Sequence, residues 1–159
     1  ALLEQSLRTF PESGELWAES VELAPKHSRK SKAEEAYKRM GKSAAVVLAT
    51  ARMWWREGQA AKAVKWAERA AALDPKLGDA FGCLVLFARR GGAATATAVD
   101  EAKVKEQVTS APPNAGERWI SVRKARGNET LSPDQVLEKV VEAEANAQAL
   151  AVKAGLGEE

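Results

Sequence analysis

The side chains best suited to catalysis are few and scattered along the chain. His27 is the only histidine and falls in a polar segment, so a metal site or a Ser-His triad lacks partners. The glycine pair at 91–92 lacks the Lys-Ser/Thr of a phosphate-binding loop. Neighbouring carboxylates at 34–35 and at 142 and 144 are typical of solvated helix faces. The sequence therefore predicts a protein that is not an enzyme, with no cofactor, no metal and no small-molecule substrate.

Two clusters of basic residues remain as candidate partner-binding sites. The first lies in the segment 25–32, which we expect to be a turn between two helices, and comprises Lys26, Arg29, Lys30 and Lys32. The second comprises Arg118, Arg123, Lys124 and Arg126. Each cluster could serve only solubility and helix-dipole compensation, or it could contact an acidic protein surface or an RNA backbone. Because every tryptophan falls on a position expected to be buried, no ring is evident for base stacking, which favours protein over RNA.

The elements that must position these residues are marked by a repeated junction, Pro-x-x-Gly-acid-x-aromatic. It occurs as PESGELW at 11–17, PKLGDAF at 75–81 and PNAGERW at 113–119. Proline cannot continue a helix, and glycine accepts the left-handed conformation of a tight turn. The acid falls near the positive end of the next helix dipole, and the aromatic residue is expected to pack against the preceding helix. The repeated structural positions are Pro11, Pro75, Pro113, Gly14, Gly78, Gly116, Trp17, Phe81 and Trp119.

The spacing of the junctions predicts an α-solenoid. The first two junctions are 64 residues apart and the next two are 38 apart. Half of the longer interval is close to one helix-pair repeat, so a degenerate junction without Pro or Gly is expected at 45–49. The resulting fold class is an all-α, right-handed superhelix of antiparallel helix pairs, with units of about 1–11, 12–41, 42–75, 76–113 and 114–155.

The clearest unit consists of expected helices at 44–58 and 60–73, with Gly58 at the turn between them. Alanines at small-residue positions allow the two helices to approach closely, and large rings at Trp54 and Trp66 fill the space that is left. Further helices are expected at 1–10, 14–24, 33–40, 79–90, 98–110 and 116–126, and from Ser132 onward, where Pro133 and Gln135 complete a capping box.

Two segments are expected to contribute little to the core. The Ala- and Thr-rich stretch 93–97 is predicted to be a mobile insertion. The last helix should carry an apolar stripe through Val136, Leu137, Val140, Val141 and Leu150, but should have little to bury beyond Ala143 and should fray before Gly155.

Composition supports one repeat domain. The chain has 159 residues, of which 45% are hydrophobic and 29% charged, and its net charge is only +2. The single cysteine, Cys83, cannot form a disulfide framework, and a reducing compartment fits. No membrane span is expected, because Arg52 interrupts the longest apolar candidate. The chain opens in mid-helix and is interpreted as a fragment of a longer protein.

The junctions, the aromatic-led first helices and the proline-closed second helices resemble half-a-TPR (HAT) repeats, a family found largely in RNA-processing scaffolds. The stretches that carry the resemblance are 14–20, the basic segment through Lys32, 47–66 and 77–81, followed by 116–119 and a final helix. Their order resembles the C-terminal end of splicing factors that bridge particles of the spliceosomal tri-snRNP. The resemblance covers about residues 1–145.

The resemblance implies a non-catalytic scaffold of pre-mRNA splicing in the nucleus. Its partners would be other spliceosomal snRNP proteins, with RNA contact possible but secondary. Two alternatives stay open: a HAT scaffold of another RNA-processing complex, such as mRNA 3′-end cleavage, and a TPR-like peptide-binding module. The peptide-binding alternative requires a concave groove in which Lys, Arg and Asn side chains converge on a carboxylate, whereas the central pair offers mainly alanines.

Overall fold

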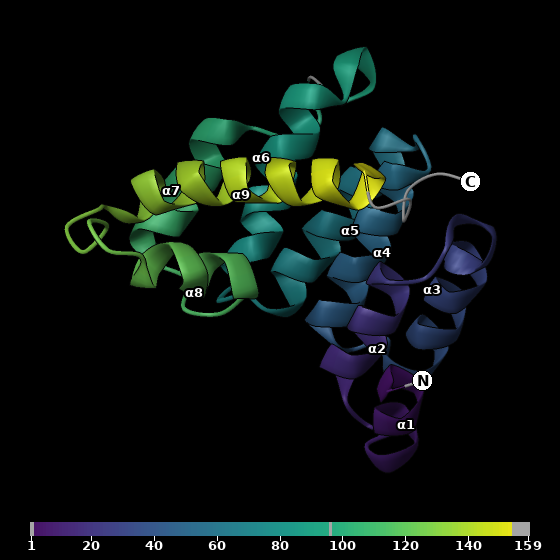
Figure 1. Cartoon of the computed structure of the whole chain (residues 1–159). Coiled ribbons are helices and arrows are strands. Elements are labelled where there is room, and N and C mark those ends of the chain that lie inside the picture. Colours follow the sequence, from purple (N-terminus) through teal and green to yellow (C-terminus); the bar gives the residue numbers. More distant parts are fainter. Residues whose placement is uncertain (1, 96, 154–159) are drawn as a thin grey trace.

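In the computed structural model, which describes residues 2–95 and 97–153, the chain folds into α-helices with no strand among the described residues (Figure 1). The helices are α1 (Leu2–Thr9), α2 (Gly14–Glu22), α3 (Lys26–Met40), α4 (Ala44–Arg56), α5 (Ala60–Leu73), α6 (Gly78–Arg90), α7 (Glu101–Ser110), α8 (Glu117–Lys124) and α9 (Pro133–Lys153). A 3-10 helix, η1, spans Gly92–Ala94. The all-α class predicted from the sequence is confirmed.

Local sequence explains where most of these helices begin. The hydroxyl oxygen of Ser13 accepts a hydrogen bond from the Leu16 amide, and that of Ser43 accepts one from the Val46 amide. Asp100 caps α7 in the same way. At α9, the Ser132 amide donates to Gln135 Oε1 at 2.9 Å, the backbone half of the predicted capping box.

One predicted boundary is wrong. The basic segment 25–32 is not a turn, because α3 begins at Lys26, directly after Pro25. Proline suits this position because its missing N–H would be unpaired at a helix start in any case. The basic residues of the first cluster therefore lie on the first turns of a helix, and the connection from α2 to α3 is reduced to 23–25.

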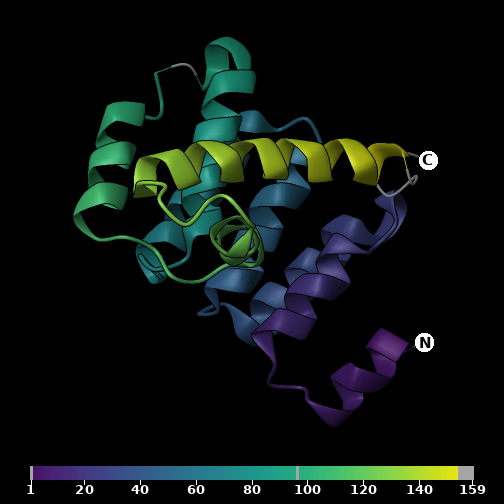
Figure 2. The same ribbon diagram turned by 60° about the vertical axis from the view of Figure 1, so that its left-hand side comes forward.

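Helices α2 to α6 pack as successive antiparallel neighbours, which is the arrangement of an α-solenoid of helix pairs (Figures 1 and 2). The N-terminal ends of α6 and α8 lie side by side. The Gly78 amide donates to the Ala115 carbonyl at 2.9 Å, and the Ala115 amide donates to the Lys76 carbonyl at the same distance. Figure 2 shows α1 projecting from the end of the stack, where it packs mainly on α2.

The junction glycines are needed for two different reasons. Gly116 has a φ of 104°, the left-handed conformation that the sequence predicted. Gly14 and Gly78 do not have a positive φ, which corrects the prediction for them. A Cβ on Gly14 would collide with the Ser43 side chain, and one on Gly78 would collide with the Trp119 ring. At these two junctions glycine therefore permits close approach of a neighbouring unit.

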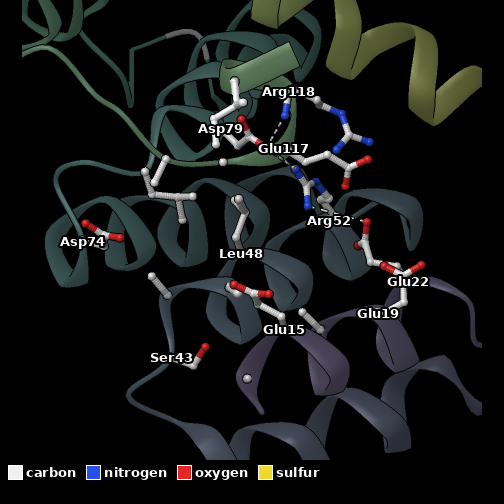
Figure 3. Close-up of a pocket in the computed structure, with 18 of the residues that line it drawn as sticks. Glu15, Glu19, Glu22, Ser43, Leu48, Arg52, Asp74, Asp79, Glu117 and Arg118 are labelled. Atoms are coloured by element: carbon white, nitrogen blue, oxygen red, sulfur yellow. Dashed lines mark hydrogen bonds and ion pairs between the residues drawn. The ribbon is translucent and has the colours of Figure 1, made fainter. Parts of the chain in front are cut away.

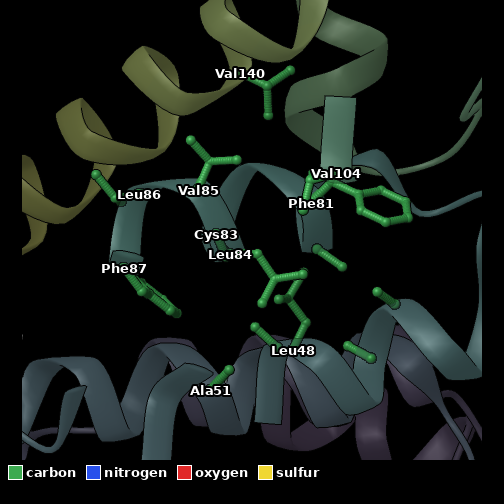
Figure 4. Packing of buried hydrophobic residues seen from close by; sticks show 14 of the residues in the cluster. Leu48, Ala51, Phe81, Cys83, Leu84, Val85, Leu86, Phe87, Val104 and Val140 are labelled. Carbon is green, nitrogen blue, oxygen red and sulfur yellow. The ribbon is translucent and has the colours of Figure 1, made fainter. Parts of the chain in front are cut away.

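The main core surrounds α6, whose residues from Gly78 to Phe87 are all buried. Figure 4 shows side chains of α6 directed both toward Leu48 and Ala51 of α4 and toward Val140 of α9. Burial on every face explains why this helix is almost entirely apolar. The three junction aromatics, Trp17, Phe81 and Trp119, are buried as predicted.

Helix α9 is packed along more of its length than the sequence predicted. It lies across α6, α7 and α8 and reaches back to α4 (Figures 1 and 2). Beyond Ala143 it buries Glu144, Gln148 and Ala151, which overturns the expectation that this part has little to bury. Leu150, placed in the apolar stripe from the sequence, is 65% exposed. The predicted fraying before Gly155 involves residues that lie partly outside the described ones.

The insertion after α6 is anchored at one residue. Thr95 is fully buried, and its hydroxyl donates to the Phe87 carbonyl at 3.0 Å. The Phe87 carbonyl also accepts a hydrogen bond from the Gly91 amide at 2.8 Å, so the Thr95 hydroxyl is a second donor to the C-terminal end of α6. The prediction that 93–97 is a mobile insertion is therefore wrong at Thr95, whereas Ala93 and Thr97 are exposed.

The tryptophans of the central pair are only partly buried. Trp54, Trp55 and Trp66 pack against the core but remain intermediate in exposure, whereas the sequence placed every tryptophan in the interior. The alanines of this pair, Ala51 and Ala63 among them, are fully buried. None of the described helices is both long enough and apolar enough to cross a membrane.

Candidate protein-docking groove

A groove lies between α2 on one side and α8 on the other, and α4 with the N-terminal end of α6 forms its floor (Figure 3). Its volume is about 950 Å³, large enough for several side chains of a partner. The groove exists because residues of α2, α4, α6 and α8 line the same hollow. Its charged lining residues are Glu15, Glu19, Glu22, Asp74, Asp79, Glu117, Arg52, Arg56 and Arg118.

A buried ion pair stands at one end of this floor. Arg52 Nη2 lies 2.7 Å from Glu144 Oε1, and Arg52 Nε donates to Glu144 Oε2 at 3.0 Å, so the pair is bidentate. Gln148 Nε2 also donates to Glu144 Oε2 at 3.0 Å. Because Glu144 and Gln148 belong to α9 and Arg52 belongs to α4, this network fixes the C-terminal helix to the groove.

Further contacts extend the network to two other helices, α2 and α8. Arg52 Nη1 lies 3.6 Å from Glu22 Oε2 on α2, and Arg118 Nε on α8 lies 3.3 Å from Glu144 Oε1. Arg56 donates to the Gln148 side chain and to the Glu22 carbonyl, each at 3.0 Å. The arginines of the groove are therefore committed to internal partners.

The network controls the protonation of its acids. Burial alone would raise the pKa of Glu144, but the charges of Arg52 and Arg118 outweigh this effect and lower that pKa to about 2. Burial raises the pKa of Glu22, with Arg52 opposing the rise only in part. Burial lowers the pKa of Arg52, but the carboxylates of Glu144 and Glu22 together raise it above its usual value, and the guanidinium stays charged. Glu144 is consequently ionised in the folded chain at neutral pH.

Asp79, the acid of the second junction, joins α6 to α8. Its carboxylate accepts hydrogen bonds from the Arg118 amide at 3.1 Å and the Trp119 amide at 2.8 Å. These amides belong to the first turn of α8, so Asp79 caps a helix in the following unit and not its own. Burial raises the pKa of Asp79, and these hydrogen bonds oppose the rise. The acid at this junction therefore sets the spacing between units.

The walls of the groove differ from its floor. Glu15 and Glu19 on α2 and Glu117 on α8 are exposed, and none of these three described side chains forms an ion pair. Two exposed apolar side chains stand beside them: Leu23 is 48% exposed and Ile120 is 38% exposed. Each wall of the groove therefore carries unpaired negative charge and one exposed apolar side chain.

The first basic cluster is not a single surface. Lys26 and Lys30 are exposed on α3, and Lys32 is paired with Glu35 at 3.1 Å. Arg29 is 0% exposed, which corrects its prediction as a partner-binding residue. The helical phase explains this, because Arg29 lies on the same face of α3 as the buried Ala33 and Ala36.

The second basic cluster is also divided. Arg118 points into the groove and is held by Glu144, so it is a structural residue there (Figure 3). Arg123, Lys124 and Arg126 are exposed at and after the C-terminal end of α8. Arg123 also donates to the Leu131 carbonyl. These three residues stay candidates for contact with a partner.

Aromatic rings and cations share the outer face formed by α3, the end of α4, and α5. Lys62 Nζ lies 4.3 Å from the Trp54 ring centroid, and Lys30 Nζ lies 5.3 Å from it. Nearby, Arg69 lies 4.7 Å from the Trp66 ring centroid, and the Tyr37 ring meets Trp66 edge-on at 5.0 Å. The sequence did not predict that these rings are partly exposed. Their faces are already covered by cations, which leaves them poorly placed to stack on bases.

The groove itself was also missed from the sequence, although one signal pointed to its buried pair. Arg52 is the only charged residue in the stretch 43–55, and a lone charge in an apolar helix requires a buried partner. Glu144, expected on a solvated face, is that partner and is 0% exposed. His27, the histidine considered for catalysis, is exposed on the first turn of α3. Cys83 is buried, and this burial raises the pKa of its thiol. No group of three or more metal-ligating side chains was found among the described residues.

The fold and the groove define an α-solenoid of helix pairs with an open concave side. The chain is similar to Protein STABILIZED1 of Arabidopsis thaliana, at 31% identity over 120 residues, which is 76% of this chain and 11% of the relative. It is also similar to pre-mRNA-processing factor 6 of Homo sapiens, at 32% identity over 100 residues, which is 63% of this chain and 10% of the relative. These proteins are partial homologues, which confirms the resemblance to HAT-repeat splicing factors.

The chain spans about a tenth of the length of these curated relatives. No protein-family model matches it.

Proposed function

We propose that the chain is a non-catalytic protein-interaction module of pre-mRNA splicing, acting in the nucleus as part of a scaffold that bridges particles of the tri-snRNP. The observation that carries this proposal is the similarity to pre-mRNA-processing factor 6 over 63% of the chain. The open groove supports it, because a stack of helix pairs offers a long surface for another protein. Its partners would be other spliceosomal snRNP proteins.

Direct contact with RNA has less support. The groove exposes carboxylates, which repel a phosphate backbone. On the outer face, cations occupy the rings that could stack on bases. A contribution from Arg123, Lys124 and Arg126 to an RNA contact stays a secondary proposal.

The test is capture of tri-snRNP proteins from nuclear extract by the immobilised chain, with and without ribonuclease, followed by mass spectrometry. We expect tri-snRNP proteins to be enriched over a bead control and to be retained after ribonuclease treatment. Loss of all of them after ribonuclease would show that the contact runs through RNA. Absence of them under both conditions would refute the splicing role of this part of the chain.

A further inference from the structure

We propose that the groove between α2 and α8 binds a segment of a protein partner that is rich in Lys and Arg, with aliphatic side chains between the charges. This inference rests on the proposed scaffold function and specifies the chemistry of the partner. It differs from the peptide-binding alternative considered for the sequence, in which cations of the chain would hold a carboxylate of the ligand.

The first observation is the sign of the charge that the groove presents. Its three arginines have internal partners: Arg52 and Arg118 contact Glu144, and Arg56 donates to Gln148 and to a backbone carbonyl. Three acids on the walls, unlike Glu22, have no such partners. A ligand entering the groove therefore meets the carboxylates of Glu15, Glu19 and Glu117, from two facing helices.

The second observation is the shape and apolar content of the same surface. The hollow is bounded by the walls α2 and α8, and its floor carries small and apolar residues, including Ala44, Ala45 and Leu48. Exposed Leu23 and Ile120 stand on the two walls. Exposed apolar groups that line a concave surface gain free energy when a ligand removes them from water.

Part of the acidic character has an internal use, which limits how much of it can be assigned to a ligand. Glu15 and Glu117 lie in the first turns of α2 and α8, where a carboxylate stabilises the helix dipole. Glu19 lies in the second turn of α2 and has no such role. Charge complementarity, the hollow and the apolar walls together favour a cationic, amphipathic segment.

The groove is rigid enough to act as a preformed site. Asp79 ties α6 to α8, and Glu144 ties α9 to α4 and α8. Glu22 of α2 lies 3.6 Å from Arg52 of α4, so both walls are joined to the floor before a ligand arrives. A preformed site loses less conformational entropy on binding.

The experiment measures fluorescence anisotropy of a short labelled peptide in which Lys and Arg alternate with Leu and Ala, titrated with the purified 159-residue chain. A matched peptide carries Glu in place of each cation. The groove variant is Glu15→Gln/Glu19→Gln/Glu117→Gln. Its control is Glu34→Gln/Glu106→Gln/Glu142→Gln, which alters three exposed glutamates on α3, α7 and α9 and changes the net charge equally.

We expect the cationic peptide to bind and the acidic one not to bind. The groove variant should weaken binding by about tenfold, because it removes three unpaired carboxylates that face the ligand. The control should change affinity less than about twofold, because distant surface charges are screened by salt. Equal weakening by both variants would reveal attraction to the net charge alone and would overturn the inference.

A second variant tests the hollow without changing charge. Ala45→Trp places a large ring in the groove, and Ala102→Trp, on the exposed side of α7, is its control. We expect only Ala45→Trp to weaken binding, with helicity of both verified by circular dichroism. Unaltered binding by Ala45→Trp with its helicity retained would place the peptide elsewhere and refute the groove.

The two proposals fail separately. Suppose that the groove variant still captures tri-snRNP proteins and that the purified chain does not bind the cationic peptide. The scaffold role is then supported, and the groove inference is wrong. If the peptide binds in the groove but extract yields no tri-snRNP protein, the binding site stands and the splicing role is wrong.

Discussion

The groove and the outer face of α3, α4 and α5 place their charges differently. In the groove, arginines are buried against acids and the unpaired carboxylates face solvent. On the outer face, Lys30, Lys62 and Arg69 stay exposed and lie over partly buried rings. The total charge of a segment therefore says little about the surface it presents, because neighbouring helices decide which charges are used internally.

The difference also has an energetic side. Buried ion pairs are costly to break, since removing one member leaves a desolvated charge without a partner. An exposed cation over a ring contributes much less, because water already solvates it. Mutations in the two regions should therefore differ in magnitude even where they remove a single charge.

The largest effect is expected from Glu144→Gln. Arg52 and Arg118 would lose the carboxylate between them, and we expect the free energy of unfolding at neutral pH to fall by about 3–5 kcal/mol. Urea denaturation followed by circular dichroism measures this change. The control Glu142→Gln, on the exposed side of α9, should change stability by less than about 0.5 kcal/mol. Similar small effects for both would show that the network does not support the groove.

The second prediction concerns pH. The pKa of Glu144 is lowered to about 2, so its stabilising contribution is present above its unfolded pKa of about 4.3 and is lost as the pH falls toward 2. That contribution is on the order of 3 kcal/mol. Glu22 and Asp79 have raised pKa values and act in the opposite direction, because protonation at lower pH relieves the cost of their buried charge.

The stability difference between the wild-type chain and Glu144→Gln should therefore shrink as the pH is lowered from about 4.3 to 2. Denaturation curves of both proteins across this range give the difference directly. A gap that stays constant would mean that Glu144 does not titrate with a lowered pKa.

An intermediate effect is expected on the outer face from Trp66→Ala. The ring is only partly buried but packs on the core and meets Tyr37 edge-on at 5.0 Å. We expect a loss of about 2 kcal/mol, less than the 3–5 kcal/mol typical of a fully buried tryptophan. Thermal unfolding with Tyr37→Phe as control, which keeps the ring contact, separates packing from the Arg69 hydrogen bond. A loss as large as that of Glu144→Gln would erase the energetic difference between the regions.

The smallest effect is expected from Lys62→Met, which removes the cation nearest the Trp54 ring and keeps an unbranched side chain. We expect a loss of about 0.5–1 kcal/mol, the magnitude of an exposed cation–π contact. Lys65→Met, an exposed lysine on the same helix, is the control and should have no measurable effect. Equal losses from both substitutions would argue against a specific contribution from the contact.

Much of the fold could be predicted because its rules act over a few residues. Gly58 has the positive φ expected of the turn between α4 and α5, and Ser132 with Gln135 forms the backbone contact expected at the start of α9. The prediction of a turn at 25–32 was wrong because lysine and arginine are as common in helices as in turns, so a run of them does not distinguish the two. Pro25 was the informative residue there, since proline is as suitable before a helix as after one.

The candidate site was predicted less well. Of the eight basic residues proposed to bind a partner, Arg29 is buried and Arg118 is held inside the groove by Glu144. A sequence shows where charges lie along a helix, but it does not show which face another helix will cover. The carboxylates of the groove come from separate units and form one surface only after those units stack.

By itself, the sequence determined that the chain is helical and that the three junction aromatics are buried, because proline, glycine, capping side chains and apolar periodicity act locally. Only the tertiary structure decided that α9 crosses back over the stack and that Arg52 meets Glu144, a residue 92 positions away. The physical reason is that helical periodicity fixes which residues share a face, whereas the crossing of helices far apart in the chain depends on how all their surfaces pack together.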